Sequence, residues 1–160
     1  MTIVVKNYFV IFLLLFSLNA VGQKVNLLNL DQLDQRIKEG RDTTFIINFW
    51  ATWCAPCVKE LPYFEKLQET HKKGPLKVLL ISLDFKSKIK SAVLPFIKRN
   101  NIKNEVYLLD ENDQQIYINR VDSSWSGALP ATLIIKKNKR NFFEKDFEYA
   151  ELLSEYQNIQ

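Results

Sequence analysis

The sequence of 160 residues contains only two cysteines and one histidine. These cannot supply a four-ligand Cys/His zinc site, and they also exclude a small scaffold held by several disulfides. Four glycines and five prolines are too few for a collagen-like or low-complexity chain. The 22 Lys and Arg nearly balance the 18 Asp and Glu, so the charge gives no indication of a nucleic-acid partner. These absences leave a globular chain of ordinary domain size.

The first 22 residues differ from the rest because a basic residue precedes an apolar run. Lys6 is followed by mostly apolar residues at 8–18, and Ala20 and Gly22 are small residues at the positions expected before a cleavage site. The pattern predicts a signal peptide at residues 1–22 and one domain at residues 23–160. The apolar run is shorter than the roughly 20 residues that span a bilayer. We therefore expect export to the periplasm, with an uncleaved N-terminal membrane anchor as the alternative.

The two cysteines, Cys54 and Cys57, are three residues apart. A structural disulfide stabilises a fold mainly by closing a long loop in the unfolded chain, and a disulfide between these two closes a very short one. In an oxidising compartment this spacing indicates a redox-active disulfide. An inert short-range disulfide is the alternative.

The cysteines fall between a predicted strand and a predicted helix. Residues 43–50 are rich in β-branched and aromatic side chains, which is typical of a strand buried on both faces. From residue 54 to about residue 71, apolar residues recur at helical spacing. Cys54 is thus expected at a helix N-terminus, where unpaired N–H groups and the helix dipole lower the pKa of a thiol. Cys57 follows about one turn later, close enough to attack a mixed disulfide on Cys54.

Residues 49–57 have the sequence FWATWCAPC, and Pro62 lies five residues after the second cysteine. This combination resembles the thioredoxin fold, and more closely the exported TlpA/ResA-like branch of the thiol-disulfide oxidoreductases. The similarity extends from about residue 25 to the C-terminus. It implies a thioredoxin-like α/β fold, a three-layer sandwich with a mixed central sheet flanked by helices. It also implies an insertion before the cis-proline strand, which residues 84–120 would hold.

The segment around Leu129 and Pro130 carries the second part of the resemblance. Proline opens an apolar, strand-like run here, where a strand tolerates it. In the thioredoxin family the matching proline is cis and faces the CxxC pair, so the resemblance implies a cis Pro130, with an ordinary trans proline as the alternative. A cis bond would leave the backbone of Leu129 free to pair with an extended substrate. The predicted substrate contacts are Trp53, Ala55, Pro56 and Leu129.

Asn48 stands where thioredoxin has a buried Asp, and an amide cannot take a proton from Cys57. The TlpA/ResA-like pattern is Cys-x-Pro-Cys-x-x-Glu, and its glutamate matches Glu60. Helical spacing places this carboxylate on the Cys57 side of the helix. A pKa raised by partial burial would let Glu60 accept the Cys57 proton. A solvated Glu60 paired with a lysine is the alternative.

The remaining chain is expected to alternate between strands and helices. The helices are predicted at residues 31–39, 86–99 and 147–157, and the strands at residues 76–83, 105–109, 133–135 and 141–143. Residues 110–126 are polar, and no helix is predicted there. The basic residues 136–140 are expected at a solvated hairpin tip.

These features together predict a thiol-disulfide oxidoreductase of the bacterial cell envelope, acting as a protein disulfide reductase. Cys54 attacks a substrate disulfide and Cys57 resolves the mixed disulfide, with no metal and no cofactor besides the redox-active Cys54–Cys57 disulfide. The resemblance implies exported protein disulfides as substrates, apocytochrome thiols in cytochrome c maturation among them. It also implies a membrane thiol-reducing electron donor, and membrane contact only through that donor or an uncleaved signal.

Two other classes of function use the same cysteines. A disulfide-introducing oxidase runs the exchange in the opposite direction, and the residues between the cysteines do not settle the direction. A non-enzymatic metallochaperone or binding module would use the two thiols as ligands, since Cu(I) accepts two thiolates.

Overall fold

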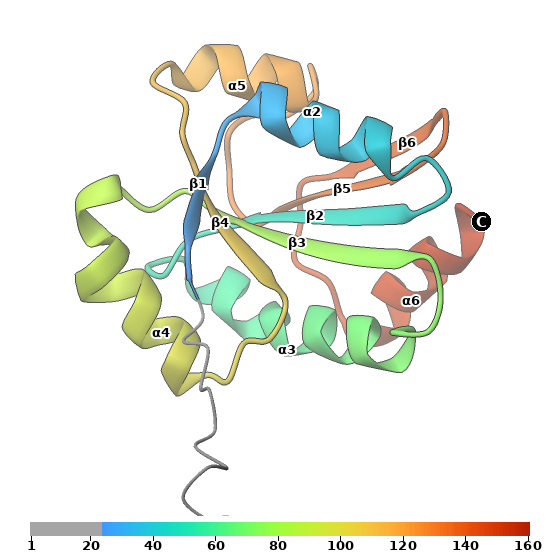
Figure 1. Ribbon diagram of the computed structural model, residues 1–160, viewed down its shortest axis with the longest axis horizontal. Coiled ribbons are helices and arrows are strands. Elements are labelled where there is room, and N and C mark those ends of the chain that lie inside the picture. The colour runs from blue at the N-terminus through green and yellow to red at the C-terminus, as the bar shows by residue number, and fades with distance from the viewer. Residues whose placement is uncertain (1–23) are drawn as a thin grey trace, which may run out of the picture.

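The computed structural model describes residues 24–160, and the predicted signal peptide lies outside these residues (Figure 1). A six-stranded sheet forms the centre of the described chain. Its strands are β1 (Asn26–Leu28), β2 (Thr44–Trp50), β3 (Leu76–Ser82), β4 (Glu105–Leu109), β5 (Ala131–Lys136) and β6 (Lys139–Phe143). Their order across the sheet is β1-β4-β3-β2-β5-β6. Strands β1 to β4 run parallel, and β5 and β6 pair antiparallel, so the sheet is mixed as expected.

Helices cover both faces of this sheet, which confirms the three-layer sandwich (Figure 1). One face carries two helices and the other carries three. The helices of the first face are α2 (Leu30–Glu39) and α5 (Gln114–Val121), and those of the second are α3 (Ala55–Thr70), α4 (Leu94–Arg99) and α6 (Tyr149–Asn158). None of the helices in residues 24–160 has the length and apolar character needed to cross a membrane.

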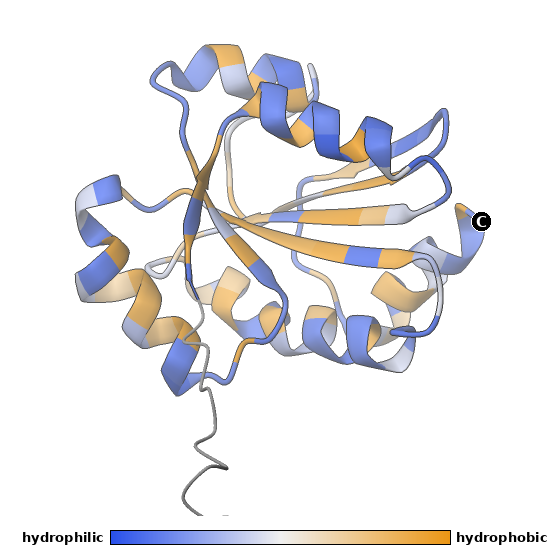
Figure 2. Ribbon diagram, in the orientation of Figure 1, coloured by the Kyte–Doolittle hydropathy of each residue, from blue (hydrophilic) through white to orange (hydrophobic). Residues whose placement is uncertain are grey.

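Strand β2 connects the two hydrophobic cores because its side chains alternate between the faces of the sheet. Ile46 and Trp50 belong to the cluster beneath α3, α4 and α6, whereas Ile47 and Phe49 belong to the cluster beneath α2 and α5. All seven residues of β2 are buried. In Figure 2 the central strands are mostly hydrophobic, and hydrophilic residues lie on the outer sides of the helices. The strand that leads to the cysteines is therefore held from both sides.

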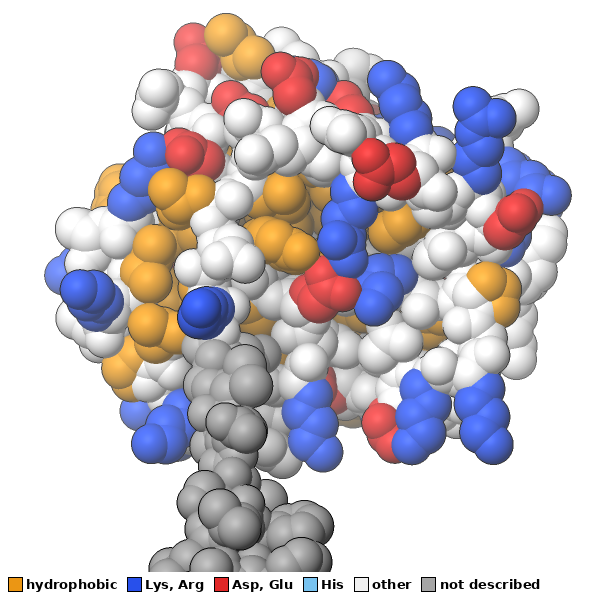
Figure 3. Space-filling view, viewed as in Figure 1, with side chains coloured by type: hydrophobic (Ala, Val, Ile, Leu, Met, Phe, Trp, Pro, Cys, Tyr) orange, Lys and Arg blue, Asp and Glu red, His pale blue; other side chains and the backbone are white. Residues whose placement is uncertain are grey.

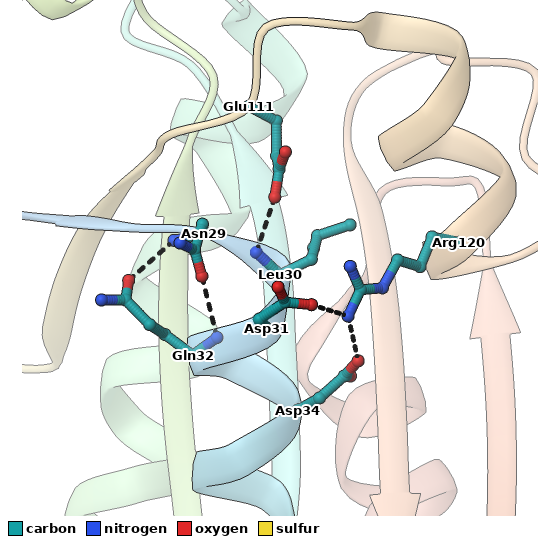
Figure 4. A network of polar contacts seen from close by, with 7 residues as sticks. All are labelled: Asn29, Leu30, Asp31, Gln32, Asp34, Glu111 and Arg120. Atoms are coloured by element: carbon teal, nitrogen blue, oxygen red, sulfur yellow. Dashed lines mark hydrogen bonds and ion pairs between the residues drawn. The ribbon is translucent and has the colours of Figure 1, made fainter.

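Charged side chains tie α2 to α5 near the N-terminus of α2 (Figure 4). Arg120 of α5 donates to Asp31 and Asp34 of α2 at 2.5 and 2.7 Å. Glu111, which follows β4, accepts a hydrogen bond from the backbone N–H of Leu30 at 2.8 Å. A carboxylate at this position also complements the positive end of the helix dipole. Ion pairs on a solvated surface add little to stability, so the cluster mainly sets how α2 and α5 lie together.

Helix α5 was not predicted, because only Ile118 and Val121 of its eight residues are buried and most of the surrounding segment is polar. Asp113 begins the helix, since its side chain accepts a hydrogen bond from the N–H of Ile116 at 3.2 Å. Residues 84–120, where the insertion was expected, thus contribute α4, β4 and α5. Strand β4 enters the sheet between β1 and β3.

The helix predicted over residues 86–99 is not one continuous α-helix. A 3-10 turn at Lys86–Lys88 and a π-helical segment at Ile89–Val93 precede α4. Pro95 occupies the first turn of α4, where a missing N–H leaves no hydrogen bond unmade. The proline therefore marks the start of a helix and not a kink within one.

Candidate functional site

The carboxyl ends of β2 and β3 form the edge of the sheet that carries the cysteines. The two strands pair in parallel, and Trp50, the last residue of β2, lies opposite Ser82, the last residue of β3. The turn after β2 leads directly into α3, with the N–H of Cys54 donating to the carbonyl of Ala51 at 3.1 Å. In parallel sheets this edge is where functional loops gather.

Cys54 and Cys57 form a disulfide across the first turn of α3, with their α-carbons 5.3 Å apart. Cys54 is the N-cap of the helix, and its sulfur accepts a hydrogen bond from the N–H of Cys57 at 3.3 Å. Pro56 fits the first turn because no N–H is needed there. Cys54 is 6% exposed and Cys57 is fully buried, so a partner reaches the sulfur of Cys54 more readily.

Glu60 is buried, with only 1% of its surface exposed, so the alternative of a solvated surface glutamate is wrong. One carboxylate oxygen accepts a hydrogen bond from the side-chain amide of Asn48 at 2.8 Å. The other accepts from the backbone N–H of Phe147 at 2.7 Å. Asn48 also donates to the hydroxyl of Thr132 at 3.1 Å. The carboxylate therefore lies in a buried polar cluster that joins β2, α3, β5 and the segment before α6.

Burial raises the pKa of the Glu60 carboxyl to about 7, although the hydrogen bonds from Phe147 and Asn48 lower it. Burial acts in this direction because it penalises the charged form of an acid. A carboxyl with a pKa near neutrality exchanges a proton readily, which is what acid–base work on a neighbouring thiol requires. The sequence-based expectation of a raised pKa thus has a physical basis in the fold.

The Leu129–Pro130 peptide bond is cis, as the resemblance implied. Pro130 directly precedes Ala131, which pairs with Phe49 near the carboxyl end of β2. The proline is therefore at the same edge of the sheet as the disulfide. Leu129 is half-buried and packs against both hydrophobic clusters, one of which contains Cys54 and Cys57.

Glu144 holds the loop before the cis-proline, a contact that the sequence analysis missed. Its carboxylate accepts hydrogen bonds from the backbone N–H groups of Ser126 and Ala128 at 3.0 and 3.1 Å, and also from the Ser126 hydroxyl. These bonds, led by the one from the hydroxyl, lower the pKa of Glu144. Because Glu144 is exposed, the loop is fastened from its solvent side.

The tryptophans near the site differ in their exposure. Trp53 is 69% exposed, and the neighbouring Ala55 and Pro56 are also exposed, so these three predicted substrate contacts are accessible. Trp125 is 4% exposed and stacks against Phe49 with ring centroids 5.0 Å apart. Trp125 is therefore a packing residue and does not line the approach to Cys54.

Asp84 is a second buried carboxylate at this edge, and the sequence analysis missed it. Its oxygens accept hydrogen bonds from the backbone N–H and the hydroxyl of Thr52 at 2.9 and 2.6 Å, and from the hydroxyl of Ser82 at 2.8 Å. The carboxylate thus ties the turn that carries Cys54 to the end of β3. The available signal was two polar residues, Ser82 at the end of an apolar strand and Asp84 two residues later.

Within residues 24–160, no cluster of three or more Cys, His, Asp or Glu side chains is arranged to hold a metal ion. The chemically reactive groups at the site are the two cysteine sulfurs and the Glu60 carboxyl. They suit electron and proton transfer between sulfur atoms.

Comparison with known proteins agrees with this geometry. Residues 17–140 match the AhpC/TSA family. The thiol-disulfide oxidoreductase ResA of Geobacillus kaustophilus is 30% identical over 105 residues, which cover 66% of this chain and 55% of that protein. Sporulation thiol-disulfide oxidoreductase A of Bacillus subtilis is 35% identical over 57 residues, covering 36% of this chain and 34% of that protein. The chain thus spans about half the length, or less, of these curated relatives.

Solved structures show the same fold. A thioredoxin-related protein from Neisseria meningitidis serogroup B superposes with a TM-score of 0.63 at 24% identity, covering 72% of this chain and 84% of that one. StoA from Bacillus subtilis superposes with a TM-score of 0.55 at 22% identity, covering 73% and 84%. The chain belongs to the AhpC/TSA family and has the thioredoxin fold.

Proposed function

We propose that this chain is a thiol-disulfide oxidoreductase of the TlpA/ResA-like kind, and that it acts as a protein disulfide reductase. The observation that carries the proposal is the Cys54–Cys57 disulfide at the N-terminus of α3, with the buried Glu60 one turn further along the same helix. The relatives named as thiol-disulfide oxidoreductases support it.

In the reduced protein, Cys54 is the attacking thiolate. The N-terminus of α3 and the N–H of Cys57 stabilise negative charge on its sulfur. The thiolate attacks one sulfur of a substrate disulfide. A bond forms between that sulfur and Cys54, the substrate disulfide breaks, and one substrate thiolate leaves.

Cys57 then resolves the mixed disulfide. Its thiol passes a proton to the Glu60 carboxylate, and the resulting thiolate attacks the sulfur of Cys54. The Cys54–Cys57 disulfide forms, the second substrate thiolate leaves, and two electrons have moved from the protein to the substrate. The pKa of Glu60, about 7, leaves a large fraction of this carboxyl ionised and able to accept the proton near neutral pH.

The substrate lies between Trp53 and the cis-proline in this proposal. The exposed Ala55 and Pro56 border the approach to Cys54. An extended substrate segment pairs with the backbone of Leu129, as strand addition to a sheet edge does in other peptide complexes.

The cellular setting belongs to the same proposal. The predicted signal at residues 1–22 supports export to the periplasm. Exported protein disulfides are then the substrates, including the disulfides of apocytochromes whose thiols must be free for haem attachment, and a membrane thiol-reducing system returns electrons to the oxidised protein. The reduction potential of the Cys54–Cys57 couple decides between reductase and oxidase, because known CxxC proteins range from about −270 to about −120 mV. A strongly oxidising couple, found mostly oxidised in cells, would favour the oxidase.

Trapping of mixed disulfides tests the exchange directly. A Cys57→Ser variant keeps the attacking thiol and lacks the resolving one, so it should accumulate covalent partners that a reductant releases. Cys54→Ser is the matched control and should trap none. If the Cys57→Ser protein traps no partner, and the reduced wild-type protein fails to reduce a small disulfide such as hydroxyethyl disulfide, the proposed function is wrong.

A further inference from the structure

A pocket of about 540 Å³ opens at the carboxyl edge of the sheet, beside the turn that carries Cys54. Its walls come from the ends of β3 and β4 and from α5. Leu83, Phe85, Leu108, Leu109 and Tyr117 supply apolar surface to this pocket. A cavity of this size can take a large side chain.

The pocket is connected to the redox centre by the buried Asp84. Thr52 lies in the turn before Cys54. Its backbone N–H and its hydroxyl donate hydrogen bonds to the Asp84 carboxylate at 2.9 and 2.6 Å. Trp53 directly follows Thr52, and Phe85 directly follows Asp84. Adjacent α-carbons are only about 3.8 Å apart, so the two aromatic residues stand close to the tied pair. The pocket and the turn that leads to Cys54 therefore share one buried residue, Asp84.

Trp53 and Phe85 are unusually open for aromatic residues, at 69% and 78% exposure. Burial of a large aromatic side chain stabilises a protein, so such side chains are commonly buried. Exposed aromatic residues beside a pocket are typical of binding surfaces. Neither residue is used by the proton and electron transfers described above.

The pocket lining carries one basic residue, Lys86, and two acidic ones, Asp84 and Glu111, and further lysines follow just outside it. Three lysines follow Phe85 within five residues, namely Lys86, Lys88 and Lys90. Lys86 pairs with Asp110, whereas Lys88 and Lys90 are exposed and form no ion pair with any residue of the described chain. Hydrophobic and basic side chains lie side by side over the α4 end of the molecule (Figure 3). The pocket thus offers apolar surface to a large side chain, and the exposed Lys88 and Lys90 outside it are complementary to acidic residues further along the same polypeptide.

We infer that this surface binds the part of a polypeptide substrate that flanks its disulfide-bonded cysteine. A large apolar side chain of the substrate enters the pocket between Phe85 and Tyr117, and acidic side chains face Lys88 and Lys90. The inference rests on the proposed function and adds a substrate class to it: polypeptides whose reactive cysteine has aromatic and acidic neighbours. The covalent steps remain those at Cys54 and Cys57.

Exchange rates with designed disulfides test this inference. Two short peptides each carry one cysteine as a mixed disulfide with a chromophoric thiol. One has phenylalanine and glutamates beside the cysteine, and the other has serine and lysines. For the reduced wild-type protein we expect kcat/KM to be at least about tenfold higher for the acidic aromatic peptide, with a preference that declines as salt rises.

Variants then assign the preference to residues. The quantity to compare is a ratio: kcat/KM for the acidic aromatic peptide divided by kcat/KM for hydroxyethyl disulfide. Phe85→Ala should lower this ratio by about tenfold. The double variant Lys88→Glu with Lys90→Glu should lower it by a similar factor. Leu27→Ala is the control for an exposed apolar residue, since Leu27 is 43% exposed on β1. Lys38→Glu with Lys73→Glu is the charge-matched control for the lysine pair. Both controls should keep the wild-type ratio.

Binding to the unaltered protein gives an independent measurement. The acidic aromatic peptide with its cysteine replaced by serine should shift the NMR signals of Phe85 and Tyr117 in the oxidised wild-type protein. Equal rates with both peptides, or equal ratios in the variants and their controls, would overturn the inference while leaving thiol exchange intact. Failure of the wild-type protein to reduce hydroxyethyl disulfide as well would overturn the proposed function, and this inference with it.

Discussion

Asp84 and Glu60 are both buried carboxylates that contact the elements carrying the disulfide, yet their surroundings differ. Asp84 accepts three hydrogen bonds, all from side chains or backbone at the ends of β2 and β3. Glu60 accepts two, and its buried side chain extends from α3, the helix that begins at the cysteines. The first carboxylate fixes a turn, whereas the second has its pKa raised by burial. The same functional group thus serves as a structural tie in one place and as a titrating group in the other.

Removal of the Asp84 carboxylate should have the largest effect on stability. Asp84→Ala leaves the N–H and hydroxyl of Thr52 and the hydroxyl of Ser82 without their acceptor, which costs about 3 to 4 kcal/mol of unfolding free energy. Urea denaturation measures this loss. Asp110→Ala, which removes a partly exposed partner of Lys86, is the control and should cost about 1 kcal/mol or less. Equal losses in the two variants would contradict the role assigned to Asp84.

Glu60 should make stability depend on pH in a way that a glutamine does not. Its pKa is about 7 in the fold and about 4.5 when unfolded, so the folded protein holds a proton that the unfolded chain releases between these values. The contribution of Glu60 is full below pH 4.5 and is lost as pH rises through about 7, a decline of about 3 kcal/mol. Denaturation of wild type and Glu60→Gln across this range measures the difference in slope.

That comparison has an internal control. Glu65, on the same helix, also has a pKa raised by burial, but it is present in both proteins, so its contribution cancels in the difference. If wild type and Glu60→Gln show parallel pH dependence, Glu60 does not titrate in this range.

The same substitution should slow the chemistry. We expect Glu60→Gln to reduce the rate at which Cys57 resolves a mixed disulfide by about 100-fold near neutral pH, because the proton acceptor is lost. The inflection near pH 7 in the wild-type rate should disappear. Rapid-mixing measurements with a chromophoric disulfide record both. An unchanged pH profile would remove Glu60 from the mechanism.

A smaller change at the turn sharpens the comparison. Thr52→Val removes one of the three donors to Asp84 and keeps the backbone N–H bond, so we expect a loss of about 1 kcal/mol in unfolding free energy. Thr70→Val is a suitable control, because the Thr70 hydroxyl bonds only to the carbonyl of Lys66 on the exposed end of α3. A Thr52→Val effect no greater than the control would mean that the hydroxyl adds nothing to the tie.

The smallest effect is expected at the exposed carboxylate. Glu144→Gln keeps one acceptor oxygen for the loop at Ser126 and Ala128 but removes the charge, so stability should fall by a few tenths of a kcal/mol. Hydrogen exchange at the amides of these two residues is the measurement, and it should become faster. Unchanged protection would show that the loop is held by its neighbours and not by Glu144.

The parts of the site that the sequence could predict depend on short motifs. The redox pair, Cys54 and Cys57, follows from the spacing of the cysteines at a predicted helix start, whereas the roles of Glu60 and the cis Pro130 were implied by the resemblance to the TlpA/ResA-like family. The burial of β2 on both faces was also visible in its composition.

The missed parts depend on contacts between distant segments. Asp84 and Thr52 are 32 residues apart, and they meet only because β2 and β3 pair in a register that places Trp50 opposite Ser82. Helix α5 was missed because the sheet buries just two of its side chains. The position of Trp125 depends on packing against Phe49, which no local pattern shows.

The hydrogen bond from the Phe147 amide to Glu60 makes the protonation state of a hidden group observable. The bond strengthens when its acceptor becomes charged, so the resonance of this one backbone proton should follow the ionisation of the carboxyl. Phe147 lies just before α6 and far from the cysteines in the chain. A spectroscopist can therefore read the protonation state of Glu60 from an unmodified backbone position.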